Sequence, residues 1–126
     1  MDHVPISKTE DQELPVPSAW RSALKEIADA FVLRTTIPQI DGFLIGPIKK
    51  DQLKICRENI GDYPDPLGPL TEESWKTSVS VWSAGYWSVQ VDLTTTSGEA
   101  SDLVLHTKVM EREDRYLIEP GLIYVP

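Results

Sequence analysis

The sequence has 126 residues, of which 40% are hydrophobic and 25% are charged. A chain of this length and composition can form one domain without disulfides or a structural metal. Its single cysteine, Cys56, excludes an intramolecular disulfide and a multi-cysteine zinc site, and the net charge of −8 argues against binding nucleic acid through its phosphates. A secretion signal and a run of about 18 apolar residues are both absent, so we expect a cytoplasmic protein with no membrane contact. The spacing of a calcium loop and a phosphate-binding glycine loop are also absent, so we expect no metal and no cofactor.

The N-terminal third predicts a tail and one amphipathic helix. Residues 1–14 are mostly polar and show no hydrophobic period, so we expect a flexible tail followed by a single domain over 15–126. Ser18 stands where a helix cap is needed, and helix-spaced apolar residues follow it: Trp20, Leu24, Ile27, Ala28 and Phe31. This pattern predicts a helix that begins near Ser18 and ends before Pro38.

The middle of the chain predicts a second helix with a basic face. Residues 35–47 mix apolar side chains with two Gly and two Pro, which indicates either a loop or one short strand near 43–45. A helix is predicted over 49–60, because Leu53, Cys56 and Ile60 share one face and Gly61 suits a left-handed C-terminal stop. Its other face carries the basic residues Lys49, Lys50, Lys54 and Arg57. This face is either exposed or paired with acidic residues elsewhere in the chain.

The C-terminal half predicts strands. Residues 62–69 contain three Pro and one Gly, which is typical of a rigid linker, and residues 71–74 suit one capped helical turn. Strands are then predicted over 75–83, 86–95, 102–112 and 115–125, with a kink or bulge at Pro120-Gly121. Their short connections predict hairpins. The expected fold is therefore α+β, with two N-terminal helices packed on a four-stranded antiparallel meander whose outline is similar to the curved, cone-shaped folds of the nuclear-transport-factor type.

Strand register suggests one cluster of polar residues. A three-residue loop at 97–99 would place Gln90 opposite His106 and Thr94 opposite Asp102, with His106 diagonal to Asp92. A histidine beside a carboxylate is suited to general acid/base chemistry. The alternative is a solvated sheet face with a surface ion pair, and the lack of a marked nucleophile or metal site beside it favours this alternative. We therefore assign no catalytic residue.

Aromatic residues suggest a second candidate site. Trp82 and Tyr86 flank the Ala84-Gly85 turn, where at least one of them is expected to be exposed and to anchor an interface, whereas Trp87 belongs to the core. The candidate binding residues are thus Trp82, Tyr86, Asp92, Asp102 and His106.

Charge is distributed unevenly along the chain. Residues 62–126 hold four Lys and Arg against eleven carboxylates, a net of −7, whereas residues 15–61 have a net of +2. Such a field attracts a cationic partner. The leading hypothesis is a non-catalytic protein-binding module, of the immunity type that neutralises a basic toxin. The alternatives are a small-molecule-binding or enzymatic domain with a pocket against the curved sheet, and a homodimer formed through the sheet face.

Several short motifs resemble a family of small bacterial proteins defined only as a domain of unknown function. They are Trp75-Lys76-Thr77-Ser78-Val79, Trp87, Val91-Asp92-Leu93, Ser101-Asp102-Leu103-Val104-Leu105 and Tyr124-Val125-Pro126, preceded by Asn59-Ile60-Gly61-Asp62-Tyr63. The resemblance covers about residues 15–126. It implies no activity and no catalytic residue.

Overall fold

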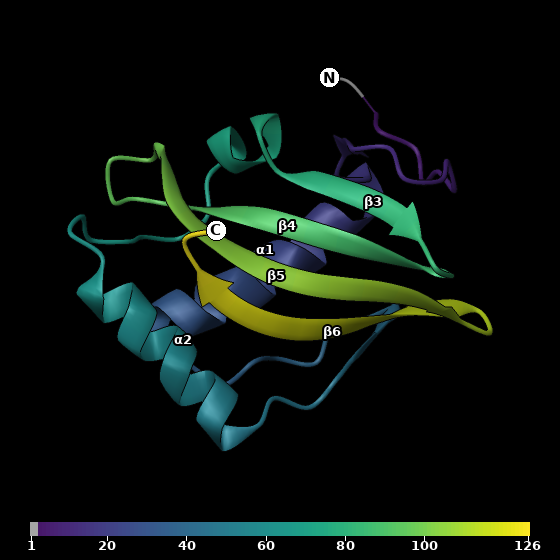
Figure 1. Ribbon diagram of the computed structural model, residues 1–126. Coiled ribbons are helices and arrows are strands. Elements are labelled where there is room, and N and C mark those ends of the chain that lie inside the picture. The colour runs from purple at the N-terminus through teal and green to yellow at the C-terminus, as the bar shows by residue number, and fades with distance from the viewer. Residues whose placement is uncertain (1–2) are drawn as a thin grey trace.

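Two helices and a six-stranded sheet make up the fold (Figure 1). The computed structural model describes residues 3–126. The elements follow in the order β1 (Leu14–Pro15), α1 (Ser18–Leu33), β2 (Phe43–Ile45), α2 (Lys50–Asp62), a 3₁₀ helix (Glu72–Lys76), β3 (Val79–Ser83), β4 (Tyr86–Thr94), β5 (Ala100–Arg112) and β6 (Arg115–Tyr124). Strands β3 to β6 form the predicted antiparallel meander, and the order across the sheet is β1-β3-β4-β5-β6-β2.

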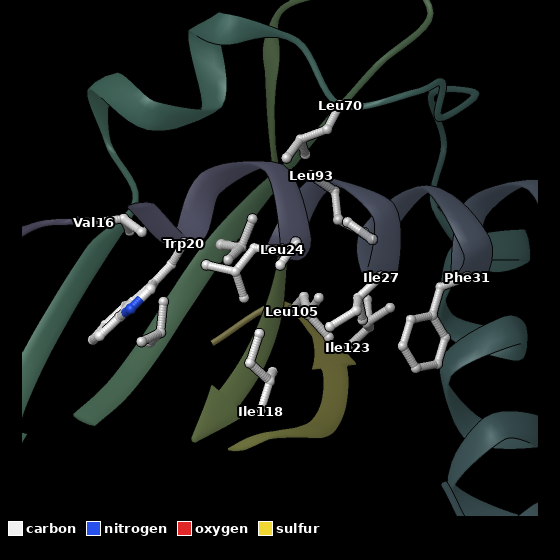
Figure 2. Packing of buried hydrophobic residues seen from close by; sticks show 14 of the residues in the cluster. Val16, Trp20, Leu24, Ile27, Phe31, Leu70, Leu93, Leu105, Ile118 and Ile123 are labelled. Carbon is white, nitrogen blue, oxygen red and sulfur yellow. The ribbon is translucent and has the colours of Figure 1, made fainter. Parts of the chain in front are cut away.

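The core lies between α1 and the sheet, as the helical period predicts (Figure 2). Helix α1 crosses one face of the meander and buries Trp20, Leu24 and Ile27 completely. The ring of Trp20 meets the ring of Trp87 from β4 edge-on, with the centroids 5.0 Å apart. Aromatic pairs in this geometry contribute beyond the area they bury, so the two tryptophans anchor the helix to the centre of the sheet.

The expected number of strands was wrong. The sheet has six strands, because β1 pairs antiparallel with β3 and β2 pairs parallel with β6. One strand therefore precedes α1 and another separates the two helices, so the helices do not form a purely N-terminal layer. Strands of two and three residues are too short to display an alternating pattern, which is why the pattern did not reveal β1 and left β2 undecided. The strand expected from Trp75 begins only at Val79, after the 3₁₀ helix.

Both helix-end predictions also differ from the structure. The side chain of Ser18 does not cap α1; its Oγ accepts a hydrogen bond from the backbone N–H of Val4 at 2.8 Å. Helix α2 continues through Gly61 to Asp62 instead of stopping in a left-handed conformation. The left-handed residue is Arg34, with φ of 58°, and it closes α1.

The predicted β4–β5 register is correct up to Asp92. Gln90 lies opposite His106 and Asp92 lies opposite Val104, but the register then shifts and Thr94 lies opposite Ala100 instead of Asp102. A second shift interrupts β5 and β6 at the predicted Pro120-Gly121 position. A Cβ atom on Gly121 would lie only 2.6 Å from the carbonyl oxygen of His106, so this bulge needs a glycine.

Helix α2 covers the part of β6 that β2 leaves unpaired. The side-chain amide of Gln52 donates to the carbonyl oxygens of Pro120 at 2.7 Å and Gly121 at 2.9 Å. About two turns further along the same face of the helix, the side-chain amide of Asn59 donates to the carbonyl of Ile123 at 2.8 Å. Side chains of α2 thus provide donors that another strand would supply to the carbonyl groups of Pro120, Gly121 and Ile123, which covers much of the edge of β6.

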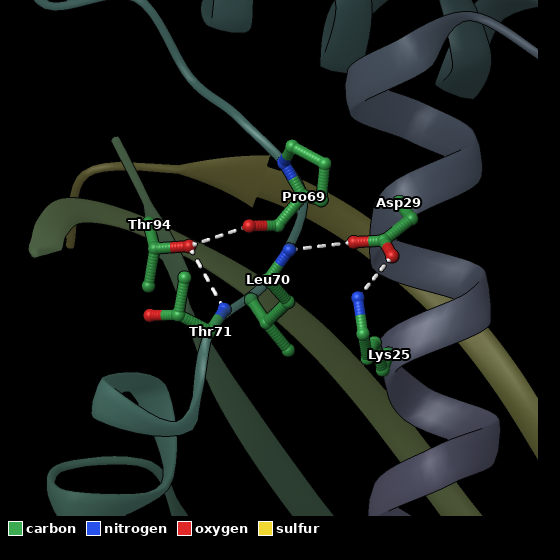
Figure 3. A network of polar contacts seen from close by, with 6 residues as sticks. All are labelled: Lys25, Asp29, Pro69, Leu70, Thr71 and Thr94. Carbon is green, nitrogen blue, oxygen red and sulfur yellow. Dashed lines mark hydrogen bonds and ion pairs between the residues drawn. The ribbon is translucent and has the colours of Figure 1, made fainter. Parts of the chain in front are cut away.

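A polar network attaches the linker before the 3₁₀ helix to the core (Figure 3). The carboxylate of Asp29 on α1 accepts a hydrogen bond from the backbone N–H of Leu70 at 2.7 Å and contacts Lys25 Nζ at 2.6 Å. The fully buried hydroxyl of Thr94 donates to the carbonyl of Pro69 and accepts from the N–H of Thr71. Because all of these partners except Pro69 are buried or half-buried, the network fixes the path of the linker across the end of the sheet.

The N-terminal segment lies against β3 and β4. The indole N–H of Trp87 donates to the carbonyl of Ser7 at 2.8 Å, and Lys8 Nζ lies 5.2 Å from the centroid of a Trp82 ring. The backbone N–H of Asp11 donates to the carbonyl of Trp82. The flexibility expected for residues 1–14 stays a prediction, and residues 1 and 2 lie outside the described part of the chain.

Candidate functional site

The face of the meander opposite α1 is the first candidate site, and we call it the outer face. Within residues 3–126 no helix lies on it (Figure 1). Successive side chains of a strand point to opposite faces of the sheet. The outer face is therefore formed by the residues next to the core positions Val89, Val91, Leu103 and Leu105. It carries Tyr86, Ser88, Gln90, Asp92, Asp102, Val104, His106, Lys108, Glu119 and Tyr124.

Asp92 and His106 both lie on the outer face, but each is directed to another partner. The carboxylate of Asp92 accepts a hydrogen bond from the hydroxyl of Thr77. The imidazole of His106 stacks on the ring of Tyr124, with centroids 4.1 Å apart and planes at 8°, and its Nδ1 lies 3.3 Å from the carbonyl of Leu122. The structure therefore brings Gln90 and His106 together, as predicted, without forming an Asp92–His106 hydrogen bond.

The candidate aromatic residues lie on opposite faces of the sheet. Trp82 packs on the core residue Trp87, with ring centroids 4.4 Å apart, and is partly covered by Lys8. Tyr86 lies on the outer face, where Lys108 Nζ is 5.0 Å from the centroid of its ring. Register explains the separation, because Trp82 pairs with Trp87 and Tyr86 pairs with Ser83. Trp82 and Tyr86 therefore do not belong to one site.

Asp102 belongs to an acidic end of the outer face, which we define as Asp65, Asp92, Glu99 and Asp102. The linker that carries Asp65 runs beside the β4–β5 turn and the start of β5, since the N–H of Thr96 donates to the carbonyl of Pro66 and the N–H of Asp102 to the hydroxyl of Tyr63. None of the four takes part in an ion pair with another of residues 3–126. This end therefore presents uncompensated negative charge.

An exposed apolar and aromatic patch adjoins the acidic end. The last residues of β6 and the position after it leave Leu122 37%, Tyr124 41% and Val125 54% exposed. Tyr124 lies opposite Val104, which itself lies opposite Asp92. A shallow depression of about 340 Å³ continues from His106 toward Lys108 and Glu119. Apolar, aromatic and charged side chains thus share one surface.

A larger cavity of about 980 Å³ lies elsewhere, between the loop 34–48, helix α2 and the β5–β6 turn. Its apolar lining includes Ile37, Ile40, Phe43, Leu44, Ile45, Ile48 and Leu53, and its charged lining consists of Arg34, Asp41, Arg57, Asp114 and Arg115. Sequence reasoning missed this cavity. The available signal was a loop that keeps several apolar residues between its glycines and prolines, which is unusual for a solvated connection.

Cys56 is buried between α2 and β6. Burial raises the pKa of its thiol, which keeps the sulfur protonated at neutral pH, and hydrogen bonds with the backbone oppose this effect only in part. Its Sγ lies 3.8 Å from the carbonyl oxygen of Gly121. The residue thus packs as a small apolar side chain with one weak hydrogen bond.

Within the described residues, no three side chains of His, Cys, Asp or Glu come together in a group that could hold a metal ion. No helix over 3–126 has both the length and the apolarity to cross a membrane.

Comparison with known proteins gives one match. The model of a family described as "Domain of unknown function (DUF7668)" matches residues 28–126. No curated protein and no solved structure matches the chain.

Proposed function

The chain belongs to the family DUF7668, which has no assigned activity, and we propose from the geometry of this member that it is a non-catalytic protein-binding domain. The observation that carries the proposal is the juxtaposition, on one uncovered sheet face, of the exposed patch at Tyr124 with the acidic end. Exposed aromatic residues next to charged ones are the usual anchors and orienting groups of protein interfaces.

Tyr124 is suited to anchor a partner. The residue is 41% exposed, and its ring is held in place by the parallel stack with His106. A side chain that is already ordered loses little conformational entropy when a partner buries it. Leu122 and Val125 extend the apolar area around it.

The acidic end favours a basic partner. Asp65, Glu99 and Asp102 are exposed, and no cation of the described chain neutralises them, so a partner's lysines and arginines would meet unpaired carboxylates. Such complementarity accelerates association and makes it sensitive to salt. Neutralising a basic toxin, as immunity proteins do, is the form of this function that we propose to test first. We place the protein in the cytoplasm, since its one cysteine is buried and unpaired.

The test is capture of partners from the native lysate by the tagged chain at low and at high salt, with identification and stoichiometry by mass spectrometry. We expect a stoichiometric basic protein that high salt releases. Tyr124→Ala and Asp102→Asn should each weaken its binding about tenfold or more, since each removes one contact at the centre of the proposed interface. The matched control is Glu26→Gln, which removes an exposed carboxylate from α1 on the opposite side of the sheet and should leave binding unchanged.

Two results would contradict the proposal. One is a partner whose affinity is the same for Tyr124→Ala, Asp102→Asn and the wild type. The other is a doubled mass in light scattering that Tyr124→Ala abolishes, because the outer face would then be occupied by a second copy of the chain.

A pocket against the sheet has less support. The depression beside His106 is shallow, and Asp92 and His106 contact other groups instead of each other. A ligand-binding role is better supported at the cavity bounded by the loop 34–48, as follows.

A further inference from the structure

Two arginines that line the large cavity form no ion pair with a carboxylate of residues 3–126. The ion pairs of residues 3–126 involve other cations, namely Lys8, Lys25, Lys54, Lys76 and Arg115. Arg34 closes α1 at the rim of the cavity, and Arg57 reaches the cavity from α2. The Nε of Arg57 is inaccessible to solvent and has no hydrogen-bond partner among the described residues.

The two guanidinium groups approach the same stretch of α2. Arg34 Nη2 lies 4.0 Å from the position that a Cβ atom would take on Gly61. Gly61 follows Arg57 by four residues and so lies one helical turn away on the same face. Two positive charges that share a half-enclosed site repel each other, and the buried Nε–H of Arg57 adds the cost of an unmade hydrogen bond. An anion placed between the two groups would offset the repulsion between them.

We infer that this cavity binds a small organic anion, with its oxyanion group held by Arg34 and Arg57 and its apolar body against Ile40, Phe43 and Leu53. A guanidinium group presents parallel N–H donors that match the two oxygens of a carboxylate or phosphate. Apolar residues of the loop, of β2 and of α2 line the cavity beside the two arginines, and its volume of about 980 Å³ is at the upper end of what small-molecule sites have. One amphipathic ligand would therefore contact both the guanidinium groups and the apolar lining of the cavity.

The carboxylates that line the cavity determine where the oxyanion group lies. Asp114 is 3.8 Å from Arg115, so this pair occupies the side formed by the β5–β6 turn. Asp41 belongs to the turn before β2 and is exposed. Both would repel an anion, whereas α2 contributes Arg57 and no carboxylate to the lining. The oxyanion group is accordingly expected at the α2 side and the apolar body toward β2.

The inference goes beyond the proposed protein-binding function, because the cavity and the outer face have no lining residue in common. A protein that binds a partner through Tyr124 can bind a small anion at Arg57 independently. Failure of one proposal therefore leaves the other standing.

Isothermal titration calorimetry on the full chain at low salt tests the inference with three probes. Octanoate carries the charge and the apolar body, octan-1-ol carries the body alone, and inorganic phosphate carries the charge alone. We expect octanoate to bind at least tenfold more tightly than either of the other probes. Amide chemical shifts should change at Ile40, Phe43 and Leu53 when octanoate is added.

Matched variants test whether Arg34 and Arg57 hold the oxyanion group. Arg57→Gln and Arg34→Gln should each weaken octanoate binding about tenfold or more, since each removes a charge-assisted hydrogen bond. Lys50→Gln removes a positive charge from the same helix at an exposed position outside the cavity, and should change the affinity less than twofold. Arg34 is exposed, so its substitution leaves the core intact and keeps the test meaningful even if Arg57→Gln lowers stability.

Three outcomes would overturn the inference. They are the absence of octanoate binding to the wild type, equal affinity for octanoate and octan-1-ol, and an equal loss of affinity in Lys50→Gln and Arg57→Gln. The first excludes the site, the second excludes recognition of the anion, and the third assigns the effect to net charge.

Discussion

Replacing Gly121 by alanine should destabilise the protein through a single backbone contact. The added Cβ would lie 2.6 Å from the carbonyl oxygen of His106 and 3.4 Å from its carbonyl carbon. Both contacted atoms belong to the backbone of a central strand, so relief requires β5 and β6 to separate locally. Overpacking of this kind costs about 1–3 kcal/mol. The carbonyl oxygen of Gly121 also accepts a hydrogen bond from Gln52, so displacement of β6 would weaken the contact with α2 as well.

The matched control is Gly61→Ala, for which the opposite sign is expected. Gly61 lies within α2, has no positive φ, and its nearest neighbour for an added Cβ is the flexible end of Arg34 at 4.0 Å. Alanine is favoured over glycine in a helix, so this variant should gain about 0.5 kcal/mol. Urea unfolding followed by tryptophan fluorescence measures both free energies. If the unfolding free energy of Gly121→Ala lies within about 0.5 kcal/mol of the wild type, the close approach to His106 is not what determines the residue at this bulge.

Three further changes test other parts of the structure. Asp29→Ala should lower the unfolding free energy by about 1–3 kcal/mol, because the backbone N–H of Leu70 loses its acceptor; an unchanged urea midpoint would contradict this. Asn59→Ala should lower the unfolding free energy by about 1 kcal/mol through the lost hydrogen bond with β6, and the expected result is a lower urea midpoint with an unchanged m-value. Cys56 should react slowly with a thiol reagent until urea unfolds the chain, and rapid reaction in buffer would refute its burial. Because burial raises the pKa of this thiol in the folded state, its contribution to stability is complete below the pKa of the unfolded thiol and is lost as pH rises through the folded pKa. The stability of the wild type relative to Cys56→Ala should therefore fall in alkaline buffer.

Long elements with a regular period were predictable from the sequence. The stripe of apolar residues around Leu24 determines α1, and alternation around Val91 determines both β4 and its register with β5. The register failed beyond Asp92, because a bulge inserts a residue without changing the type of residue that the sequence presents there. The short strand β1 was not predictable, since it forms only through pairing with β3, whereas the strand at 43–45 was one of two alternatives that the sequence left open.

The candidate sites were predictable only as residue types. Sequence alternation placed Asp92 and His106 on one face correctly. It carried no information about their actual partners, which are the hydroxyl of Thr77 for Asp92 and the ring of Tyr124 for His106. The cavity depends on how the loop 34–48 returns to β6, and that path is set by a parallel pairing between residues more than seventy positions apart. Local patterns do not encode contacts of that range.

The covered edge of β6 matters for folding during synthesis as well as for the folded protein. During synthesis β1, β2 and α2 leave the ribosome before the strands whose edges they cover. When β6 emerges after them, the groups that pair with its free side, including Gln52 and Asn59, are already present. Once β6 has paired with β5, its own outer edge therefore need not stay open, and an open edge is the state in which β-sheet proteins recruit other chains and aggregate.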